Sequence, residues 1–277
     1  MQGPQKKDHK DRNNGRPESS LALAGSHEHE SKPIPSKVVA MTQSGDKPER
    51  CLSLVMPVFN EAATLRESLD RVLAQPFVAE VIAVNDASTD NSGEILHSIT
   101  DPRVKVMHHK INQGKGAAIR TGIQEATAPY VGIQDADLEY DPADLQRLLT
   151  PLQAGLADAV YGSRFLTTDY HRVLYYWHSV GNRALTLASN MLTNINLTDM
   201  ETCYKVFRRE LIQSIPIEEN RFGFEPEITV KLAKRKVRIY EVGISYSGRT
   251  YEEGKKINWK DGVSAMRCLI KYSFKKS

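Results

Sequence analysis

Short apolar runs alternate with amphipathic stretches from residue 52 onward. The runs that predict strands cover residues 52–57, 80–85, 104–109, 130–133, 157–165 and 237–246. Apolar residues at helical spacing predict helices over residues 61–74, from 92, 115–126, 141–155, 179–194 and 224–235. This alternation is typical of βαβ units, whose crossover helices cover both faces of a parallel sheet. The pattern therefore predicts an α/β fold with a mostly parallel sheet flanked by helices.

The two ends of the chain differ from this pattern. Residues 1–49 are polar and predict a disordered extension. Residues 251–277 are basic and place apolar side chains at helical spacing, namely Val263, Met266, Ile270 and Phe274. Such a helix suits an anionic membrane surface, but it also suits packing against the domain. We divide the folded part into residues 50–165, 166–250 and 251–277.

Composition narrows the function classes. The 277 residues carry 37 basic and 34 acidic side chains, so the net charge of +3 does not call for a nucleic-acid partner. The three cysteines form no CxxC pair, which suits a reducing compartment. No secretory signal and no run of about 18 apolar residues occurs. We expect a cytoplasmic protein, at most peripheral to a membrane.

Two carboxylates follow the apolar run 130–133 with only Ala136 between them. Asp135 and Asp137 are hard oxygen ligands that suit Mg²⁺ or Mn²⁺, and a cation there would accept the oxygens of a diphosphate. A helix cap or a solvated turn is the structural alternative for such a pair. Their position beyond a buried strand favours the metal, because ligands of open parallel sheets bind at the carboxyl ends of strands.

The stretch "NQGKG" places Lys115 and flexible backbone at a predicted helix N-terminus. It does not match the P-loop, because the earlier glycine is absent and Gly116 replaces the hydroxyl residue after the lysine. The site suits anionic groups, and a plain turn between strand and helix is the alternative.

Five motifs in order resemble the inverting glycosyltransferases of family 2. They are "PVFNE", "VNDASTDNS", "NQGKGAAIRTG", "DADLEYDP" and "GSRF". The resemblance runs from about Leu52 to Trp259 and is strongest to the enzymes similar to dolichol-phosphate mannose synthase. It implies a GT-A type, Rossmann-like fold with a C-terminal acceptor-side extension. Residues 50–165 would then bind a nucleotide sugar, residues 166–250 the acceptor, and residues 251–277 would form a mobile basic loop and an amphipathic helix.

The resemblance implies roles on the sugar-donor side. Residues that would contact the nucleotide are Pro57, Phe59, Glu61, Asp86 and Lys115. Asp135 and Asp137 would hold the divalent metal and the diphosphate. Glu139 stands near the metal in this pattern, although a solvent-facing residue fits it equally. The chain departs from the family's "VDDGS", with Asn85 and Ala87 in place of Asp and Gly, which leaves GDP- and UDP-sugars both open.

The acceptor side is implied in the same way. Arg164 would grip the acceptor phosphate, and Arg172, His178 or Arg183 would assist. Asp199 would lie close to the acceptor as a base or an orienting group, with a helix cap as the alternative. Arg249, assisted by Lys255 or Lys256, would meet the leaving diphosphate from a loop, and a solvated charge run is the alternative there.

The expected reaction is transfer of mannose or glucose to a polyprenyl or dolichyl phosphate with inversion. The phosphate attacks the anomeric carbon unaided, because it is largely a dianion at neutral pH. A saccharide or soluble acceptor is the main alternative. A nucleotidyltransferase is disfavoured because "MPVFNE" lacks a glycine-rich loop, and a non-catalytic nucleotide-binding scaffold is disfavoured by the intact charged motifs.

Overall fold

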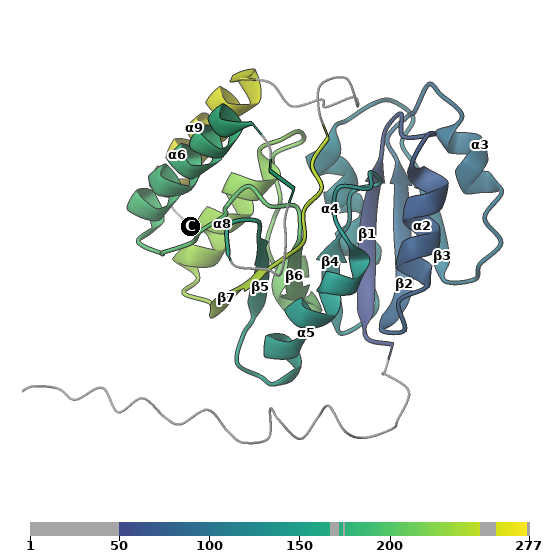
Figure 1. Cartoon of the computed structure of the whole chain (residues 1–277), viewed down its shortest axis with the longest axis horizontal. Helices are drawn as coiled ribbons and strands as arrows, with labels where there is room; N and C mark the ends of the chain where they lie inside the picture. Colours follow the sequence, from purple (N-terminus) through teal and green to yellow (C-terminus); the bar gives the residue numbers. More distant parts are fainter. Residues whose placement is uncertain (1–49, 167–171, 174, 250–258, 276–277) are drawn as a thin grey trace, which may run out of the picture. The chain divides into compact units, whose positions relative to one another are not determined.

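Seven strands form one mixed sheet in the computed structural model (Figure 1), which describes residues 50–166, 172–173, 175–249 and 259–275. The strands are β1 (Leu52–Val58), β2 (Val78–Asn85), β3 (Val104–His108), β4 (Tyr130–Ile133), β5 (Ala159–Ser163), β6 (Lys205–Arg208) and β7 (Ile239–Gly243). Their order is β3-β2-β1-β4-β6-β5-β7, and β6 alone runs antiparallel to its neighbours among these strands. The predicted α/β fold with a mostly parallel sheet is confirmed.

Helices cover both faces of this sheet. They are α2 (Leu65–Leu73), α3 (Ser92–His97), α4 (Lys115–Glu125), α5 (Leu145–Gln153), α6 (Tyr176–Thr193), α7 (Arg209–Gln213), α8 (Phe224–Lys234) and α9 (Trp259–Phe274), with a 3₁₀ turn η1 at Pro142–Asp144. In Figure 1, α2 lies in front of the sheet and α4 behind it, whereas α6, α8 and α9 pack together at the β7 end. The right-handed crossovers of parallel strands produce this two-sided cover.

The core is built by the apolar runs of the central strands. Leu54 and Val55 of β1 are fully buried, as are most residues of β2 and β4. Helix α4 approaches β1 so closely that a Cβ on Gly122 would lie 2.4 Å from Val55 Cγ1. Strands covered on both faces read as continuous apolar runs, which is why the sequence predicts them well.

Two short elements were not predicted. Strand β6 has only four residues and includes the fully buried Lys205, and α7 has five residues. Neither is long enough to show a period. Helix α2 begins at Leu65 and not at residue 61, because the preceding residues form a turn.

Helix α9 lies within the basic C-terminal segment. One side of α9 is buried against the domain through Ala265, Cys268, Leu269 and Tyr272. Val263, Ile270 and Phe274 are exposed, so packing accounts for only one face. Within the described part of the chain, no helix has the length and apolar character needed to span a bilayer. The expected disordered extension, residues 1–49, and the mobile loop within 250–258 lie outside the described residues.

Candidate active site

The loops after β1 and β2 are held together by side chains. Asn60 has a left-handed backbone with φ of 54°, its N–H donates to Ser88 Oγ at 3.1 Å, and its Oδ1 accepts from the Thr89 N–H at 2.8 Å. Pro57 lies partly exposed near the end of β1, and Phe59 exposes 39% of its surface just beyond it. An exposed ring at this edge suits the predicted contact with a nucleoside.

Asp86 is buried beneath this edge, with 2% of its surface exposed. Its Oδ1 accepts from the Gln113 N–H at 2.9 Å and lies 2.6 Å from His109 Nδ1, while its Oδ2 accepts from the Gly114 N–H at 2.7 Å. Both oxygens therefore hold the loop that leads into α4. Recognition of a base by Asp86 stays a prediction.

Lys115 lies between two acids at the first turn of α4. Its Nζ is 2.9 Å from Asp135 Oδ1 and 3.5 Å from Glu225 Oε1, although the three side chains come from distant parts of the sequence. Burial acts to lower the pKa of Lys115, but Asp135, Cys203 and Glu225 outweigh it and hold the pKa well above its usual value. The lysine is therefore charged and is already committed to Asp135.

Arg249 lies among the other acids of the predicted donor side. Its Nη2 is 2.7 Å from Asp137 Oδ2, its Nε is 3.1 Å from Glu139 Oε1, and its Nη1 is 3.7 Å from Glu61 Oε2. Tyr246 donates its hydroxyl to Glu139 Oε2 at 2.9 Å. Glu139 thus faces protein donors and not solvent. The structure brings Arg249 together with the three predicted acids Glu61, Asp137 and Glu139.

Asp137 is the most perturbed of these carboxyls. Burial, followed by repulsion from Asp135 and Glu139, raises the pKa of Asp137 to about 7, and Arg249 only partly offsets this. A cation placed beside Asp137 would favour the charged form of this carboxyl.

A buried ion pair occupies the predicted acceptor side. Arg164 Nε and Nη2 each lie 2.7 Å from an oxygen of Asp199, and the Arg164 N–H donates to the same carboxylate at 3.0 Å. Burial acts to raise the pKa of Asp199, but Arg164 outweighs it and holds the pKa below the usual value. Asp199 is therefore neither a helix cap nor a solvated acid. It orients Arg164, whose guanidinium also lies 5.2 Å from the centroid of the Tyr246 ring.

The other basic residues predicted for the acceptor side lie against a backbone carbonyl or an aromatic ring. Arg172 donates to the Gly248 carbonyl at 2.9 Å, and the Arg183 guanidinium lies 5.3 Å from the Phe165 ring centroid. His178 packs its ring near Tyr175. Lys255 and Lys256 lie outside the described residues.

The predicted metal ligands were compared with the chemistry of Mg²⁺ and Mn²⁺. In the described ranges, which omit 250–258, no three acidic, histidine or cysteine side chains converge closely enough to hold an ion by themselves. Asp135 and Asp137 do supply hard oxygen donors, and Mg²⁺ commonly takes one or two carboxylates and completes its shell with phosphate oxygens and water. The raised pKa of Asp137, caused by burial and by the carboxylates of Asp135 and Glu139, fits a cation that arrives together with a diphosphate.

Sequence reasoning missed Glu225 and Tyr246. Glu225 stands in the first turn of α8, where an acid normally signals only a favourable helix dipole. Tyr246 lies in a short segment after β7, yet it contacts both Glu139 and Arg164. No local pattern marks either residue, since their partners lie about 80 to 110 positions away in sequence.

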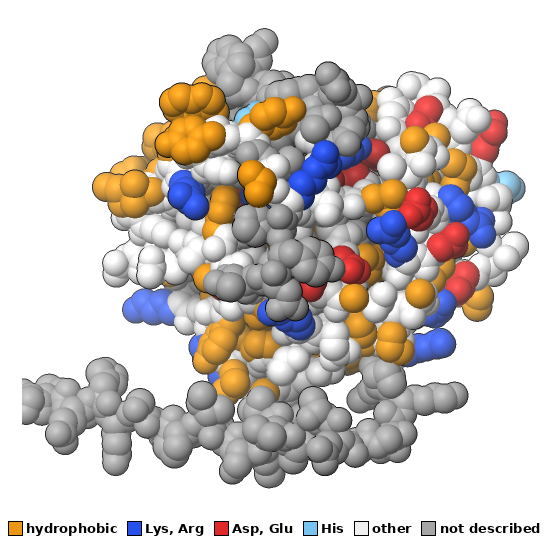
Figure 2. Space-filling model, in the orientation of Figure 1, with side chains coloured by type: hydrophobic (Ala, Val, Ile, Leu, Met, Phe, Trp, Pro, Cys, Tyr) orange, Lys and Arg blue, Asp and Glu red, His pale blue; other side chains and the backbone are white. Residues whose placement is uncertain are grey.

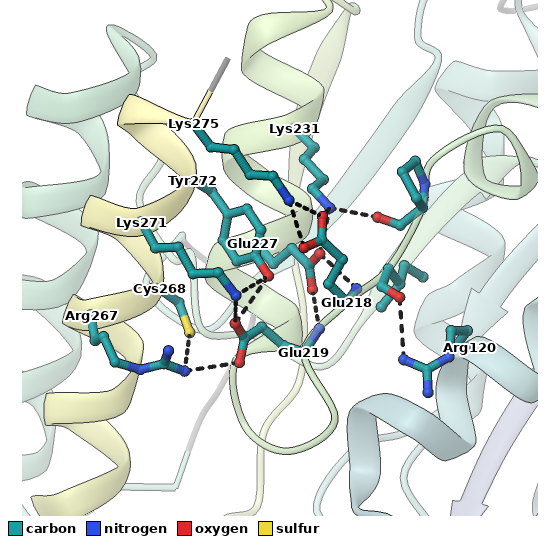
Figure 3. A network of polar contacts seen from close by, with 12 residues as sticks. Arg120, Glu218, Glu219, Glu227, Lys231, Arg267, Cys268, Lys271, Tyr272 and Lys275 are labelled. Carbon is teal, nitrogen blue, oxygen red and sulfur yellow. Dashed lines mark hydrogen bonds and ion pairs between the residues drawn. The ribbon is translucent and has the colours of Figure 1, made fainter. Parts of the chain in front are cut away.

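The segment 218–221 joins the loop before α4 to α9. A Cβ on Gly116 would lie 2.3 Å from the Glu219 carbonyl oxygen, and the Ala117 N–H donates to the Asn220 carbonyl at 3.1 Å. On its other side, Glu219 accepts from Arg267 at 3.0 Å and from Lys271 at 2.8 Å (Figure 3). The first turn of α4, which carries Lys115, therefore rests on a segment that α9 clamps.

The mixed sheet with helices on both faces is a GT-A fold. Residues 53–215, more than half of the chain, match the model described as glycosyl transferase family 2, and the chain belongs to this family. Relatives include an undecaprenyl-phosphate mannosyltransferase of Micrococcus luteus, 29% identical over 73% of this chain and 85% of the relative. A polyprenol monophosphomannose synthase of Mycolicibacterium smegmatis is 26% identical over 73% of this chain and 80% of the relative.

Two further proteins extend the comparison. A dolichyl-phosphate beta-glucosyltransferase of Trichomonas vaginalis is 25% identical over 77% of this chain and 71% of the relative. Among solved structures, glucosyl-3-phosphoglycerate synthase of Mycobacterium tuberculosis, in complex with Mn²⁺, UDP-glucose and phosphoglyceric acid, aligns with a TM-score of 0.62 and 20% identity. That alignment covers 81% of this chain and 80% of the neighbour, and it shows a shared fold.

Proposed function

We propose that the chain transfers a hexose, mannose or glucose, from a GDP- or UDP-sugar to a polyprenyl or dolichyl phosphate, with inversion at the anomeric carbon. The observation that carries this proposal is the junction at Tyr246. Its hydroxyl contacts Glu139, which together with Asp135 and Asp137 we call the acidic group. Its ring lies against Arg164, which forms the buried ion pair with Asp199. A sugar-donor site and a phosphate-acceptor site would then share one wall.

On the sugar-donor side, Asp135 and Asp137 would hold Mg²⁺ or Mn²⁺ with the diphosphate. The metal would neutralise charge on the departing nucleoside diphosphate. Arg249 would exchange its carboxylate partners for phosphate oxygens, because a guanidinium pairs with either group through the same planar fork. Phe59 and Pro57 would contact the nucleoside.

On the acceptor side, Arg164 would bind the phosphate. Asp199 holds the Nε–Nη2 edge of the guanidinium in place, which limits the entropy lost when a phosphate binds. A carboxylate whose pKa lies below its usual value is a poor proton acceptor. We therefore assign Asp199 an orienting role, and the phosphate dianion would serve as its own nucleophile.

The polyprenyl acceptor is supported by the names of the relatives from Micrococcus luteus, Mycolicibacterium smegmatis and Trichomonas vaginalis. A small phosphorylated acceptor is the second candidate, because the structural neighbour from Mycobacterium tuberculosis is crystallised with phosphoglyceric acid. Both candidates present a phosphate, so Arg164 alone does not distinguish them. For the lipid acceptor, we propose that the protein works at the cytoplasmic face of a membrane.

A transfer assay tests the proposal. The protein would be incubated with GDP-mannose, UDP-glucose and related donors, Mg²⁺ or Mn²⁺, and either undecaprenyl phosphate or phosphoglyceric acid. We expect a glycolipid from one donor with wild type and none with Asp137→Asn. Asp70→Asn, on the exposed side of α2, is the matched control and should keep full activity. Transfer only to the small acceptor would replace the lipid proposal by the second candidate.

A further inference from the structure

Helix α6 exposes apolar side chains along its whole length. Tyr176, Trp177, Leu187 and Met191 expose 72%, 77%, 61% and 77% of their surfaces. The 18 residues of α6 contain no Asp, Glu or Lys. A helix at the surface of a soluble domain normally turns a charged face to water. Figure 2 shows the resulting gathering of hydrophobic side chains over α6, at the upper left.

Helix α9 packs beside α6 and adds to this surface. Ile270 exposes 49% and Phe274 77% of their surfaces. We call the following six residues the α6–α9 face: Tyr176, Trp177, Leu187, Met191, Ile270 and Phe274. Exposed apolar side chains gathered in this way mark a site of interaction.

The charges around this face are mainly positive. Arg183 is the only residue of α6 that is always charged. On α9, Arg267, Lys271 and Lys275 are three cations that share the two carboxylates Glu218 and Glu219 (Figure 3). Aromatic and aliphatic side chains flanked by excess cations are the composition of surfaces that insert into the headgroup region of anionic bilayers.

The face also continues into the candidate acceptor site. The Phe165 ring lies 5.9 Å from the Arg164 guanidinium on one side and 5.3 Å from that of Arg183, on α6, on the other. A lipid phosphate held at Arg164 would therefore lie one aromatic ring away from α6. A second copy of the chain would cover an apolar face equally well, but it would not use this continuity or the surplus of cations.

We propose that the α6–α9 face docks on the surface of an anionic lipid bilayer, with α6 lying in the interface and α9 beside it. We expect vesicle binding because the side chains of this face are apolar, exposed and flanked by cations. The link from the face to a lipid acceptor rests on the proposed function.

Vesicle flotation tests the docking. The full chain would be mixed with phosphatidylcholine vesicles with and without phosphatidylglycerol. We expect wild type to float with the anionic vesicles, and the triple variant Trp177→Glu, Leu187→Glu, Met191→Glu to bind at least about tenfold more weakly. The matched control is Tyr240→Glu, which changes an exposed aromatic residue on β7 and should bind like wild type. Circular dichroism checks that each variant is folded.

Tryptophan fluorescence locates the contact. The chain has two tryptophans, so Trp259→Phe leaves Trp177 as the only reporter. We expect its emission to shift to the blue on anionic vesicles and to be quenched by brominated lipid. Unchanged emission, or equal flotation of wild type and the triple variant, would overturn the proposal.

Two further outcomes separate membrane docking from dimer formation and from the proposed function. Light scattering could show that wild type is a dimer and the triple variant a monomer, with no binding to vesicles. The α6–α9 face would then be covered by a second copy of the chain, and the proposal would be wrong. Transfer to undecaprenyl phosphate in detergent does not require docking. Activity in detergent without vesicle binding would therefore reject the docking face and leave the proposed function standing. Vesicle binding without activity in detergent would reject the proposed function and leave the docking face standing.

Discussion

At the scale of single residues, the properties of the acidic group follow from burial and crowding. Asp135, Asp137 and Glu139 stand within five positions, and the Glu139 N–H donates to Asp137 Oδ1 in the turn after β4. Arg249 reaches two of them, and Lys115 reaches the third. Burial, followed by repulsion from Asp135 and Glu139, raises the pKa of Asp137 to about 7, so an added cation would favour the charged form of this carboxyl.

Replacing Asp137 with Asn should therefore abolish transfer without unfolding the domain. The variant keeps the volume and removes the charge. We expect turnover to fall by about 100-fold or more, because a metal that stabilises a leaving diphosphate contributes several kcal/mol. Calorimetric titration with Mn²⁺ and a nucleoside diphosphate should show the same loss of binding. Normal Mn²⁺ binding in this variant would contradict the assignment.

Replacing Asp199 with Asn should have a different effect, on stability first. It leaves the buried Arg164 guanidinium without its counter-charge, and such losses cost about 3 kcal/mol or more. The measurement is chemical unfolding of wild type and variant. A catalytic base with no structural task would instead lose activity at unchanged stability, so an unaltered unfolding midpoint would refute the orienting role.

At the scale of elements, long and periodic segments were predictable and short ones were not. The strands β1 and β2 and the helix α4 follow from their patterns, because burial on one or both faces imposes a period. β6 does not, since four residues with a buried lysine carry no period. For the candidate site, the position of Asp135 and Asp137 after a strand and the family resemblance for Arg249 predicted these residues, but Tyr246 enters only through the fold.

The clamp between α9 and the segment 218–221 should respond to pH. Burial acts to raise the pKa of Glu219, but Lys271, Tyr272 and Arg267 outweigh it and lower the pKa from 4.5 to about 2. A lowered carboxyl pKa contributes stability above the ordinary value and loses it as pH falls. Wild type should therefore be more stable than Glu219→Gln at pH 7, by about 1–2 kcal/mol. The difference should vanish between pH 4.5 and about 2.

Thermal unfolding across this pH range measures the effect. Glu210→Gln on α7 is the control, because Glu210 is an exposed glutamate outside the α9 clamp. A constant difference between wild type and Glu219→Gln down to pH 2 would show that the carboxylate charge does not hold α9.

At the scale of the whole molecule, both predicted halves contribute to one sheet. β6 comes from residues 166–250, yet it pairs with β4 and β5, both of which belong to residues 50–165. The described residues accordingly form part of one compact unit, Gly45–Ser277. We expect a fragment of residues 50–165 to lack cooperative unfolding, whereas residues 45–277 should unfold in a single transition. Calorimetry of the two chains checks this, and a sharp transition in the fragment would show that the first half folds alone.

The position of β6 also bears on how the chain is made. During synthesis, β4 and β5 leave the ribosome well before residues 205–208, so each presents an unpaired edge until the strand between them arrives. Nascent chains with such edges are prone to associate with one another and with chaperones. A translational pause ahead of β6 would lengthen that exposure, and one after it would not.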